Sequence, residues 1–133
     1  MLKTIPELIT EARSELRCLE ATLAVAEAKE RGGVIIDVRE TAEVQHTPAP
    51  GSVHIPRGIL EMKVVEQIKE ADVPIYLHCA SGARATLAAE QLLRMGYEQV
   101  TVITCPIEKV CAAQDSQANE LIASYAPVRR NQS

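Results

Sequence analysis

The chain has 133 residues, a formal net charge of −4, 47% hydrophobic residues and 24% charged residues. This length and balance are typical of one globular domain that needs no disulfide or metal to fold. The chain has three Tyr, no Phe and no Trp, and its basic residues form no long run. Because single-stranded nucleic acid stacks on aromatic side chains and duplexes bind positive surfaces, we expect no nucleic-acid partner.

The first residues do not have the pattern of a secretory signal. Residues 1–16 carry acidic side chains early and contain no continuous apolar segment. No stretch approaches the roughly 20 apolar residues that cross a bilayer, so we expect no membrane partner and a cytoplasmic location. In that reducing compartment the four cysteines are predicted to be thiols, because they have neither the paired spacing of a zinc site nor the density of a disulfide framework.

Helical and strand-like patterns alternate in the first part of the chain. Residues 6–16 have apolar side chains at helical spacing and predict a short amphipathic helix, and residues 16–19 predict a brief strand. Residues 20–33 repeat small and apolar residues at helical spacing and end at a glycine pair suited to a helix C-cap. The continuous apolar start of residues 34–40 is typical of a strand buried on both faces of a parallel sheet.

The remaining elements follow a long irregular segment. Residues 41–58 hold three of the seven prolines and two glycines, which predicts an ordered loop without regular structure. Beyond it the patterns predict a helix at 59–70, a strand at 74–79, a helix ending at Gly96, a strand at 99–104 and a helix near 107–123.

This alternation predicts an α/β fold with a central, mostly parallel sheet and helices on both faces. We expect one domain over residues 1–133, with a core at about 17–123, an N-terminal helix within 1–16 and a tail at 124–133. Ligands of such sheets lie beyond the carboxyl ends of the strands. Two polar clusters fall there: Asp37 with Arg39, and His78 with Cys79.

Residues 79–84, Cys-Ala-Ser-Gly-Ala-Arg, join a predicted strand to a predicted helix. So short a connection must turn tightly, and Gly82 takes a positive φ at little cost. Such a turn points backbone N–H groups into one concavity, and the helix adds its positive dipole end. Because that field favours thiolate over thiol, Cys79 is predicted to be a nucleophile. Ser81 offers a hydroxyl donor, and Arg84 offers either fixed positive charge or a structural ion pair.

These features resemble the rhodanese family of sulfurtransferases. The resemblance has three parts in the expected order over roughly residues 30–105: a strand followed by Asp-Val-Arg at 37–39, a Pro-Gly loop ending in Ile-Pro at 50–56, and Cys-x4-Arg at 79–84. It implies a rhodanese-like domain in which Cys79 accepts a sulfane sulfur, holds it as a persulfide and passes it on. It also implies that the persulfide is held by the backbone N–H groups of Ala80, Ser81, Gly82, Ala83 and Arg84.

The implied chemistry is a thiolate displacement at sulfur, like thiol–disulfide exchange, and needs neither a metal nor an organic cofactor. The expected donors are thiosulfate and low-molecular-weight or protein persulfides. The expected acceptors are thiols, cyanide or a carrier protein. Phosphatases and arsenate reductases with a similar loop have Cys-x5-Arg, a wider cradle for a tetrahedral oxyanion, so the four intervening residues here favour sulfur over phosphorus.

The segment before the Pro-Gly pair departs from the family. Thr47, Pro48 and Ala49 stand where Gly-His-Ile is usual, and His46 and His54 are nearby alternatives for the missing histidine. This departure keeps open a second hypothesis, in which the chain is a catalytically weak binding or regulatory module with the rhodanese fold.

Other polar residues and thiols have less specific roles. Asp37 and Arg39 are expected to brace the adjacent loops, and Arg57 is either a positive rim residue or a solvated arginine. His78 should point away from Cys79, because side chains alternate along a strand, and it is not expected to be a general base. A further hypothesis is that Cys105 or Cys111 resolves the persulfide as a disulfide, although two unreactive thiols are favoured.

Overall fold

The structure is a computed structural model that describes residues 1–130, with side chains described for residues 1–120. Within this part of the chain, five strands form one sheet in the order β1-β5-β4-β2-β3, and every neighbouring pair is parallel. The strands are β1 (Arg17–Leu19), β2 (Val34–Asp37), β3 (Val53–His54), β4 (Ile75–His78) and β5 (Val100–Ile103). The predicted α/β fold with a mostly parallel central sheet is therefore confirmed.

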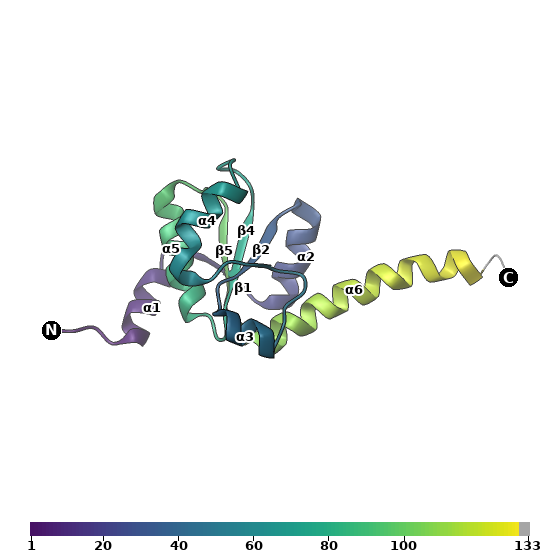
Figure 1. The fold of residues 1–133 in the computed structure, drawn as a ribbon, viewed down its shortest axis with the longest axis horizontal. Helices are drawn as coiled ribbons and strands as arrows, with labels where there is room; N and C mark the ends of the chain where they lie inside the picture. Colours follow the sequence, from purple (N-terminus) through teal and green to yellow (C-terminus); the bar gives the residue numbers. More distant parts are fainter. Residues whose placement is uncertain (131–133) are drawn as a thin grey trace.

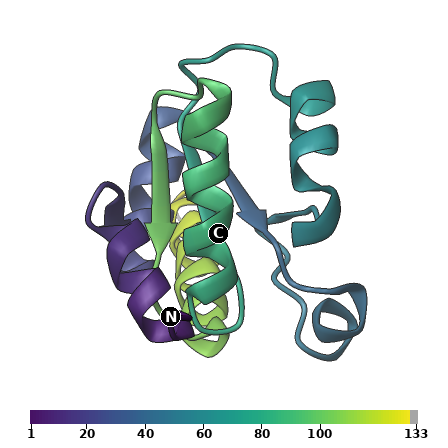
Figure 2. The same ribbon diagram turned by 90° about the vertical axis from the view of Figure 1, so that its left-hand side faces the viewer.

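Helices cover both faces of the sheet (Figures 1 and 2). One face carries α1 (Ile5–Arg13), α4 (Leu60–Gln67) and α5 (Ala83–Met95), and the other carries α2 (Ala21–Arg31) and α6 (Ile107–Arg130). The short helix α3 (Thr41–His46) lies near the start of α6, and the 3-10 turn η1 (Arg57–Ile59) precedes α4 (Figure 1). No helix in the described part of the chain is both long and apolar enough to cross a membrane.

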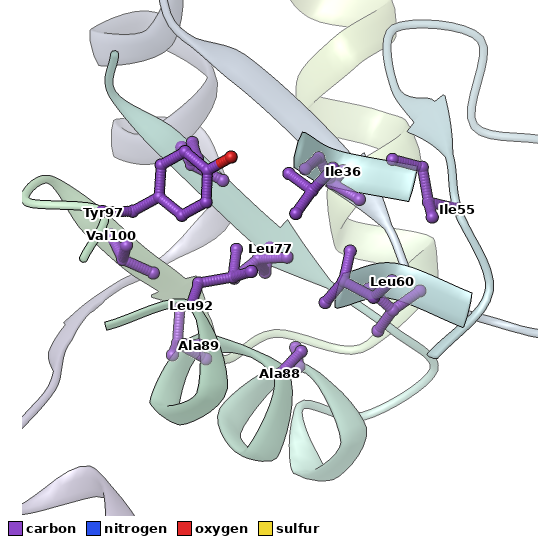
Figure 3. Close-up of a cluster of buried hydrophobic side chains, with 14 of the residues drawn as sticks. Ile36, Ile55, Leu60, Leu77, Ala88, Ala89, Leu92, Tyr97 and Val100 are labelled. Atoms are coloured by element: carbon purple, nitrogen blue, oxygen red, sulfur yellow. The ribbon is translucent and has the colours of Figure 1, made fainter. Parts of the chain in front are cut away.

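Side-chain alternation along the strands fills two hydrophobic clusters, one on each face of the sheet. Figure 3 shows the cluster beneath α4 and α5, where Ile36 and Leu77 of the sheet meet Leu60 and Leu92 of the helices. Cys79 belongs to this cluster, whereas Tyr76 belongs to the cluster beneath α2 and α6. The period of two therefore directs the Cys79 side chain toward the α5 face.

The ends of two helices lie where the sequence predicts them. The carboxylate of Glu20 accepts the backbone N–H groups of Thr22 and Leu23 at the start of α2. That helix ends at Gly32 with φ 65°, and α5 ends at Gly96 with φ 111°. Both glycines take the left-handed conformation that terminates a helix at little cost.

The prediction that residues 41–58 lack regular structure is wrong. This segment contains α3, β3 and two residues of η1. The Glu43 carboxylate accepts the backbone N–H of Glu40 at 3.0 Å. This capping contact stabilises the start of α3, because Glu40 is the residue directly before the helix. The helix has only six residues before the segment with prolines at 48 and 50, and this is too short for an apolar period to show.

The carboxyl-terminal helix is longer than predicted. It continues to Arg130, so the predicted helix end near 123 is wrong and residues 124–130 of the predicted tail are helical. Residues 131–133 lie outside the described part of the chain. No glycine interrupts residues 107–130, so the sequence contains no strong C-cap signal at 123. In Figure 1 this helix extends away from the sheet.

Candidate active site

Cys79 lies directly after β4, and its side chain is almost completely buried, with 1% of the residue exposed. Two backbone N–H groups point at its sulfur: that of Gly82 at 3.1 Å and that of Ala85 at 3.4 Å. Both come from the loop and first turn of α5, a helix of 13 residues. The sulfur therefore lies at the positive end of the helix, where donors without intrahelical partners favour an anion.

The turn in this loop depends on Gly82. Its φ is +104°, and a Cβ added to it would lie 2.7 Å from Nη2 of Arg13 and 3.3 Å from the carbonyl oxygen of Thr104. The loop is further held by the N–H of Ile107, which donates to the carbonyl oxygen of Ala80 at 3.0 Å. The concavity around Cys79 is thus fixed by packing and hydrogen bonds from both sides.

The predicted loop and the observed donors overlap only in part. Among Ala80, Ser81, Gly82, Ala83 and Arg84, Gly82 is the residue whose N–H contacts the sulfur in the described structure. Ser81 is exposed, and its hydroxyl makes no hydrogen bond within residues 1–120. The second donor, Ala85, was missed. Its signal is its place in the first turn of α5, where a helical N–H has no intrahelical partner.

Arg84 forms a structural ion pair, one of the two alternatives that the sequence leaves open. Its Nη1 and Nη2 donate to the two carboxylate oxygens of Glu43 at 2.6 and 2.8 Å. This pairing lowers the pKa of Glu43 to about 2, with a further contribution from the backbone N–H of Glu40, and it raises the pKa of Arg84. Glu43 was missed because its helix α3 was expected to be irregular loop.

Asp37 and Arg39 connect β2 to the neighbouring helix α3. They form a buried ion pair, 1% and 2% exposed, in which Nε and Nη2 of Arg39 lie 2.8 to 3.1 Å from the carboxylate oxygens. The same guanidinium donates to the carbonyl oxygen of Glu43 within α3 and to that of Thr47 directly after it. Arg39, which is oriented by Asp37, thereby holds α3, the helix that carries the partner of Arg84.

His78 lies on the face opposite Cys79, as strand alternation predicts. Its Nε2 is 2.7 Å from Oγ of Ser52, which also accepts a hydrogen bond from Gln114 of α6 at 2.8 Å. Burial lowers the pKa of His78 to about 4, although Asp37, 3.9 Å from Nδ1, acts in the opposite direction. His78 is therefore a neutral structural residue at pH 7.

The atypical segment 47–51 packs on α6. Ala49 is buried, the carbonyl oxygen of Pro48 accepts from Sγ of Cys111 at 3.3 Å, and the N–H of Gly51 donates to Gln114 at 3.3 Å. A Cβ on Gly51 would lie 3.0 Å from the Gln114 side chain, so the backbone passes close to the helix. This segment is a packing contact between the sheet edge and α6.

Within the described residues, His46, His54 and Arg57 make no hydrogen bond to Cys79 or to its loop. Nε2 of His54 lies 2.7 Å from the carbonyl oxygen of Arg39, which gives it a bracing role. His46 is exposed at the end of α3. Arg57 pairs with Glu61, one helical turn later, at 3.0 Å, so its charge is compensated locally.

The four cysteines are free thiols, as predicted. Sγ of Cys105 accepts the N–H of Ala21 at 3.2 Å, and burial raises the pKa of Cys111. Each of these two sulfurs thus has a hydrogen-bond partner on an element other than the Cys79 loop.

The comparison with known families follows this geometry. The family model of the Rhodanese-like domain matches residues 21–113, which is more than half of the chain. The chain belongs to the rhodanese-like domain family. Within this rhodanese-like domain the match includes β2, the Cys79 loop and α5, whereas α1 lies outside it.

Two curated relatives match half of this rhodanese-like domain protein. The chain is 41% identical over 66 residues to the putative sulfur carrier protein YrkF of Bacillus subtilis, covering 50% of this chain and 35% of that protein. It is 33% identical over 67 residues to a sulfurtransferase of Allochromatium vinosum, covering 50% of this chain and 61% of that protein. The matched stretch therefore spans less than two thirds of either relative.

A solved structure extends the likeness to most of the fold. The chain matches a protein of unknown function from Rhodopseudomonas palustris, with the name possible tyrosine phosphatase, at a TM-score of 0.70 and 26% identity. The likeness covers 85% of this chain and 92% of that one.

Proposed function

We propose that this protein is a sulfurtransferase in which Cys79 carries sulfur as a persulfide. The observation that carries the proposal is the pair of backbone N–H groups, from Gly82 and Ala85, aimed at Sγ at the start of α5. Donors in this position stabilise an anionic sulfur, both the attacking thiolate and the terminal sulfur of the loaded enzyme. The names of both curated relatives, a sulfur carrier protein and a sulfurtransferase, support the same chemistry.

The reaction divides into two displacements at sulfur. With thiosulfate, the Cys79 thiolate attacks the sulfane sulfur, the S–S bond breaks, and sulfite leaves with the electron pair. With cyanide, the acceptor carbon attacks the terminal sulfur of the persulfide, thiocyanate leaves, and the thiolate is regenerated. Neither step requires a proton donor for Cys79, which agrees with a neutral His78 whose side chain lies on the opposite face of the sheet.

The burial of Cys79 limits the donors. Because only 1% of the residue is exposed, a donor must present a narrow terminal sulfur to the bottom of the loop. Between Cys79 and Arg84 the loop side chains are small and uncharged, so they provide room but little selectivity. We propose thiosulfate or a low-molecular-weight or protein persulfide as donor, and a thiol, cyanide or carrier protein as acceptor. The cytoplasmic location remains a prediction.

The test is sulfur loading followed by mass spectrometry of the intact protein. After incubation with thiosulfate, glutathione persulfide or a persulfide-loaded cysteine desulfurase, we expect one added sulfur on Cys79 and release of thiocyanate on addition of cyanide. Cys79→Ser should abolish both, and Cys111→Ser is the matched control because that thiol lies on α6 and should leave both unchanged. Failure of all three donors to load Cys79 would contradict the proposal.

The other two hypotheses predict different results. In a binding module, no donor loads Cys79 and its alkylation follows the pH dependence of a free thiol. The name of the Rhodopseudomonas palustris protein includes the words possible tyrosine phosphatase. If this chain is a phosphatase, it hydrolyses a phosphotyrosine mimic in a Cys79-dependent reaction. The four-residue spacing between Cys79 and Arg84 favours sulfur over that larger oxyanion.

A further inference from the structure

Arg13 contacts the Cys79 loop from outside the matched family region. It lies in the last turn of α1, which packs against α5 (Figure 2). Ile9 and Ala12 of this helix are buried. Nε of Arg13 donates to Oγ1 of Thr86 at 3.0 Å, across 73 positions of sequence. The family match begins at residue 21, so this contact is an addition to the matched domain.

A hydrogen-bond chain connects Arg13 to the residue that holds the sulfur. The Thr86 hydroxyl, which accepts from Arg13, donates to the carbonyl oxygen of Gly82 at 2.7 Å. Gly82 in turn donates its N–H to Sγ of Cys79 at 3.1 Å. Arg13 also packs directly on Gly82, because its Nη2 lies 2.7 Å from the position of an added Cβ. The guanidinium and the sulfur therefore contact the same residue.

The charge of Arg13 is not neutralised as the charges of the neighbouring arginines are. Arg39, Arg57 and Arg84 each form an ion pair with a carboxylate. Among residues 1–120, whose side chains are described, no carboxylate lies within ion-pair distance of Arg13. The Arg13 side chain is half-buried, and a positive charge is screened less there than in open solvent.

We propose that Arg13 is a positioning residue for the Cys79 reaction. It holds Gly82 with its N–H directed at the sulfur, through Thr86 and by direct packing, and its uncompensated charge stabilises the anionic sulfur. The inference rests on the proposed function in one respect, that Cys79 is the nucleophile. Helix α1 is then a functional addition that supplies the cation which Arg84, paired with Glu43, does not supply.

The test measures alkylation of Cys79 by iodoacetamide between pH 5 and 10 in the full chain, with Cys79 followed by peptide mass spectrometry. Iodoacetamide is small and uncharged, so a change in protein charge does not alter its approach. For Arg13→Gln we expect a rate about tenfold lower at pH 7, a curve moved to higher pH and an unchanged rate at the alkaline plateau. Arg13→Lys keeps the cation and should restore most of the rate at pH 7.

Two further variants separate positioning from general effects. Arg94→Gln removes the same charge from the exposed last turn of α5, far from the loop, and should leave the curve unchanged. Thr86→Val removes the hydroxyl link but keeps the cation, and its effect should be smaller than that of Arg13→Gln and less than additive with it. Melting curves identify any variant that loses α1 packing.

The outcomes are decisive in both directions. An Arg13→Gln curve that coincides with that of Arg94→Gln overturns the proposal, as does an Arg13→Lys curve identical to that of Arg13→Gln. Alkylation does not involve a sulfur donor, so it tests Arg13 even if no persulfide forms. Absence of loading in the unaltered chain would contradict the proposed function and leave this result standing.

Discussion

Arg84 and Glu43 join the end of the Cys79 loop to α3 through a two-point ion pair, with N–O distances of 2.6 and 2.8 Å. Both side chains are about one-third exposed, at 35% and 36%, so the pair lies at the surface around the loop. The positive charge of Arg84, the arginine of Cys-x4-Arg, is therefore neutralised by the Glu43 carboxylate in this structure. This predicts that Glu43 limits the attraction of the site for anionic donors.

Glu43→Gln should release that charge. We expect the KM for thiosulfate to fall several-fold with little change in kcat, because a dianion gains from an unpaired guanidinium before the chemical step. Arg84→Gln should raise the KM for thiosulfate, because the Glu43 carboxylate is then left unpaired near the loop. The measurement is steady-state thiocyanate formation at varied thiosulfate.

The control for this pair is Glu66→Gln, which removes the same charge from the surface of α4. Glu43→Gln and Glu66→Gln should each alter the free energy of unfolding by about 1 kcal/mol or less, because exposed ion pairs contribute little to stability. A KM for thiosulfate that rises in Glu43→Gln would contradict a donor-repelling role for this carboxylate.

Gly82→Ala should damage the site more than its backbone strain alone explains. The substitution places a Cβ at φ +104° and 2.7 Å from Arg13. Left-handed backbone costs an alanine about 1–2 kcal/mol, and the contact adds to that cost. The matched control is Gly96→Ala, which has φ +111° but open space around the added Cβ. We expect chemical denaturation to show a larger loss for Gly82→Ala, and sulfur loading to fall only in that variant.

An equal loss of stability in the two alanine variants would show that the Arg13 side chain moves away from the added Cβ at little cost in free energy. In that case the packing of Arg13 on Gly82 is loose, and the hydrogen bond through Thr86 remains as its link to the loop.

The sequence could predict the sheet and the place of Cys79 because both depend on local patterns. Apolar runs mark β2 and β4, Gly32 and Gly96 mark helix ends, and the short step from Cys79 to α5 forces a turn at Gly82. Alternation of side chains along a strand also sufficed to separate His78 from Cys79.

The partners of the loop could not be predicted, because they depend on long-range contacts. Arg84 meets Glu43 across 41 positions, and Arg13 meets Thr86 across 73. No local pattern encodes which helix faces which loop, and α3 is too short for periodicity to show. The sequence therefore gave no signal that Glu43 lies beside the Cys79 loop.

Arg39→Met should be among the most destabilising single changes in the chain. It leaves the Asp37 carboxylate buried without its partner, and it removes the donors to the carbonyl oxygens of Glu43 and Thr47. Loss of one partner of a buried ion pair costs roughly 3–5 kcal/mol. Urea denaturation measures this loss, and Arg57→Met, at a half-exposed pair, should cost about 1 kcal/mol or less. Equal losses in the two variants would contradict a bracing role for Arg39.

Stability should fall between pH 6.5 and pH 4 because of His78. Its pKa is lowered from 6.5 to about 4 by burial, so the unfolded chain binds a proton in this range that the folded chain does not. Stability therefore decreases as the pH falls through this range, by up to about 3 kcal/mol. The pKa values of Glu27 and Glu43, lowered to about 2, place their contribution in a separate range, lost as the pH falls from 4.5 toward 2.

His78→Gln separates the two ranges. The variant should be less stable than the parent at pH 7, because it disturbs the contact with Ser52 and the packing of a fully buried side chain. Its free energy of unfolding, measured by urea titration at a series of pH values, should nevertheless be nearly flat from pH 6.5 to pH 4.5. The acid loss below pH 4.5 should remain, because Glu27 keeps its ion pair with Arg17 and Glu43 keeps its ion pair with Arg84. A slope between pH 6.5 and pH 4.5 that is the same in both proteins would assign that loss to a group other than His78.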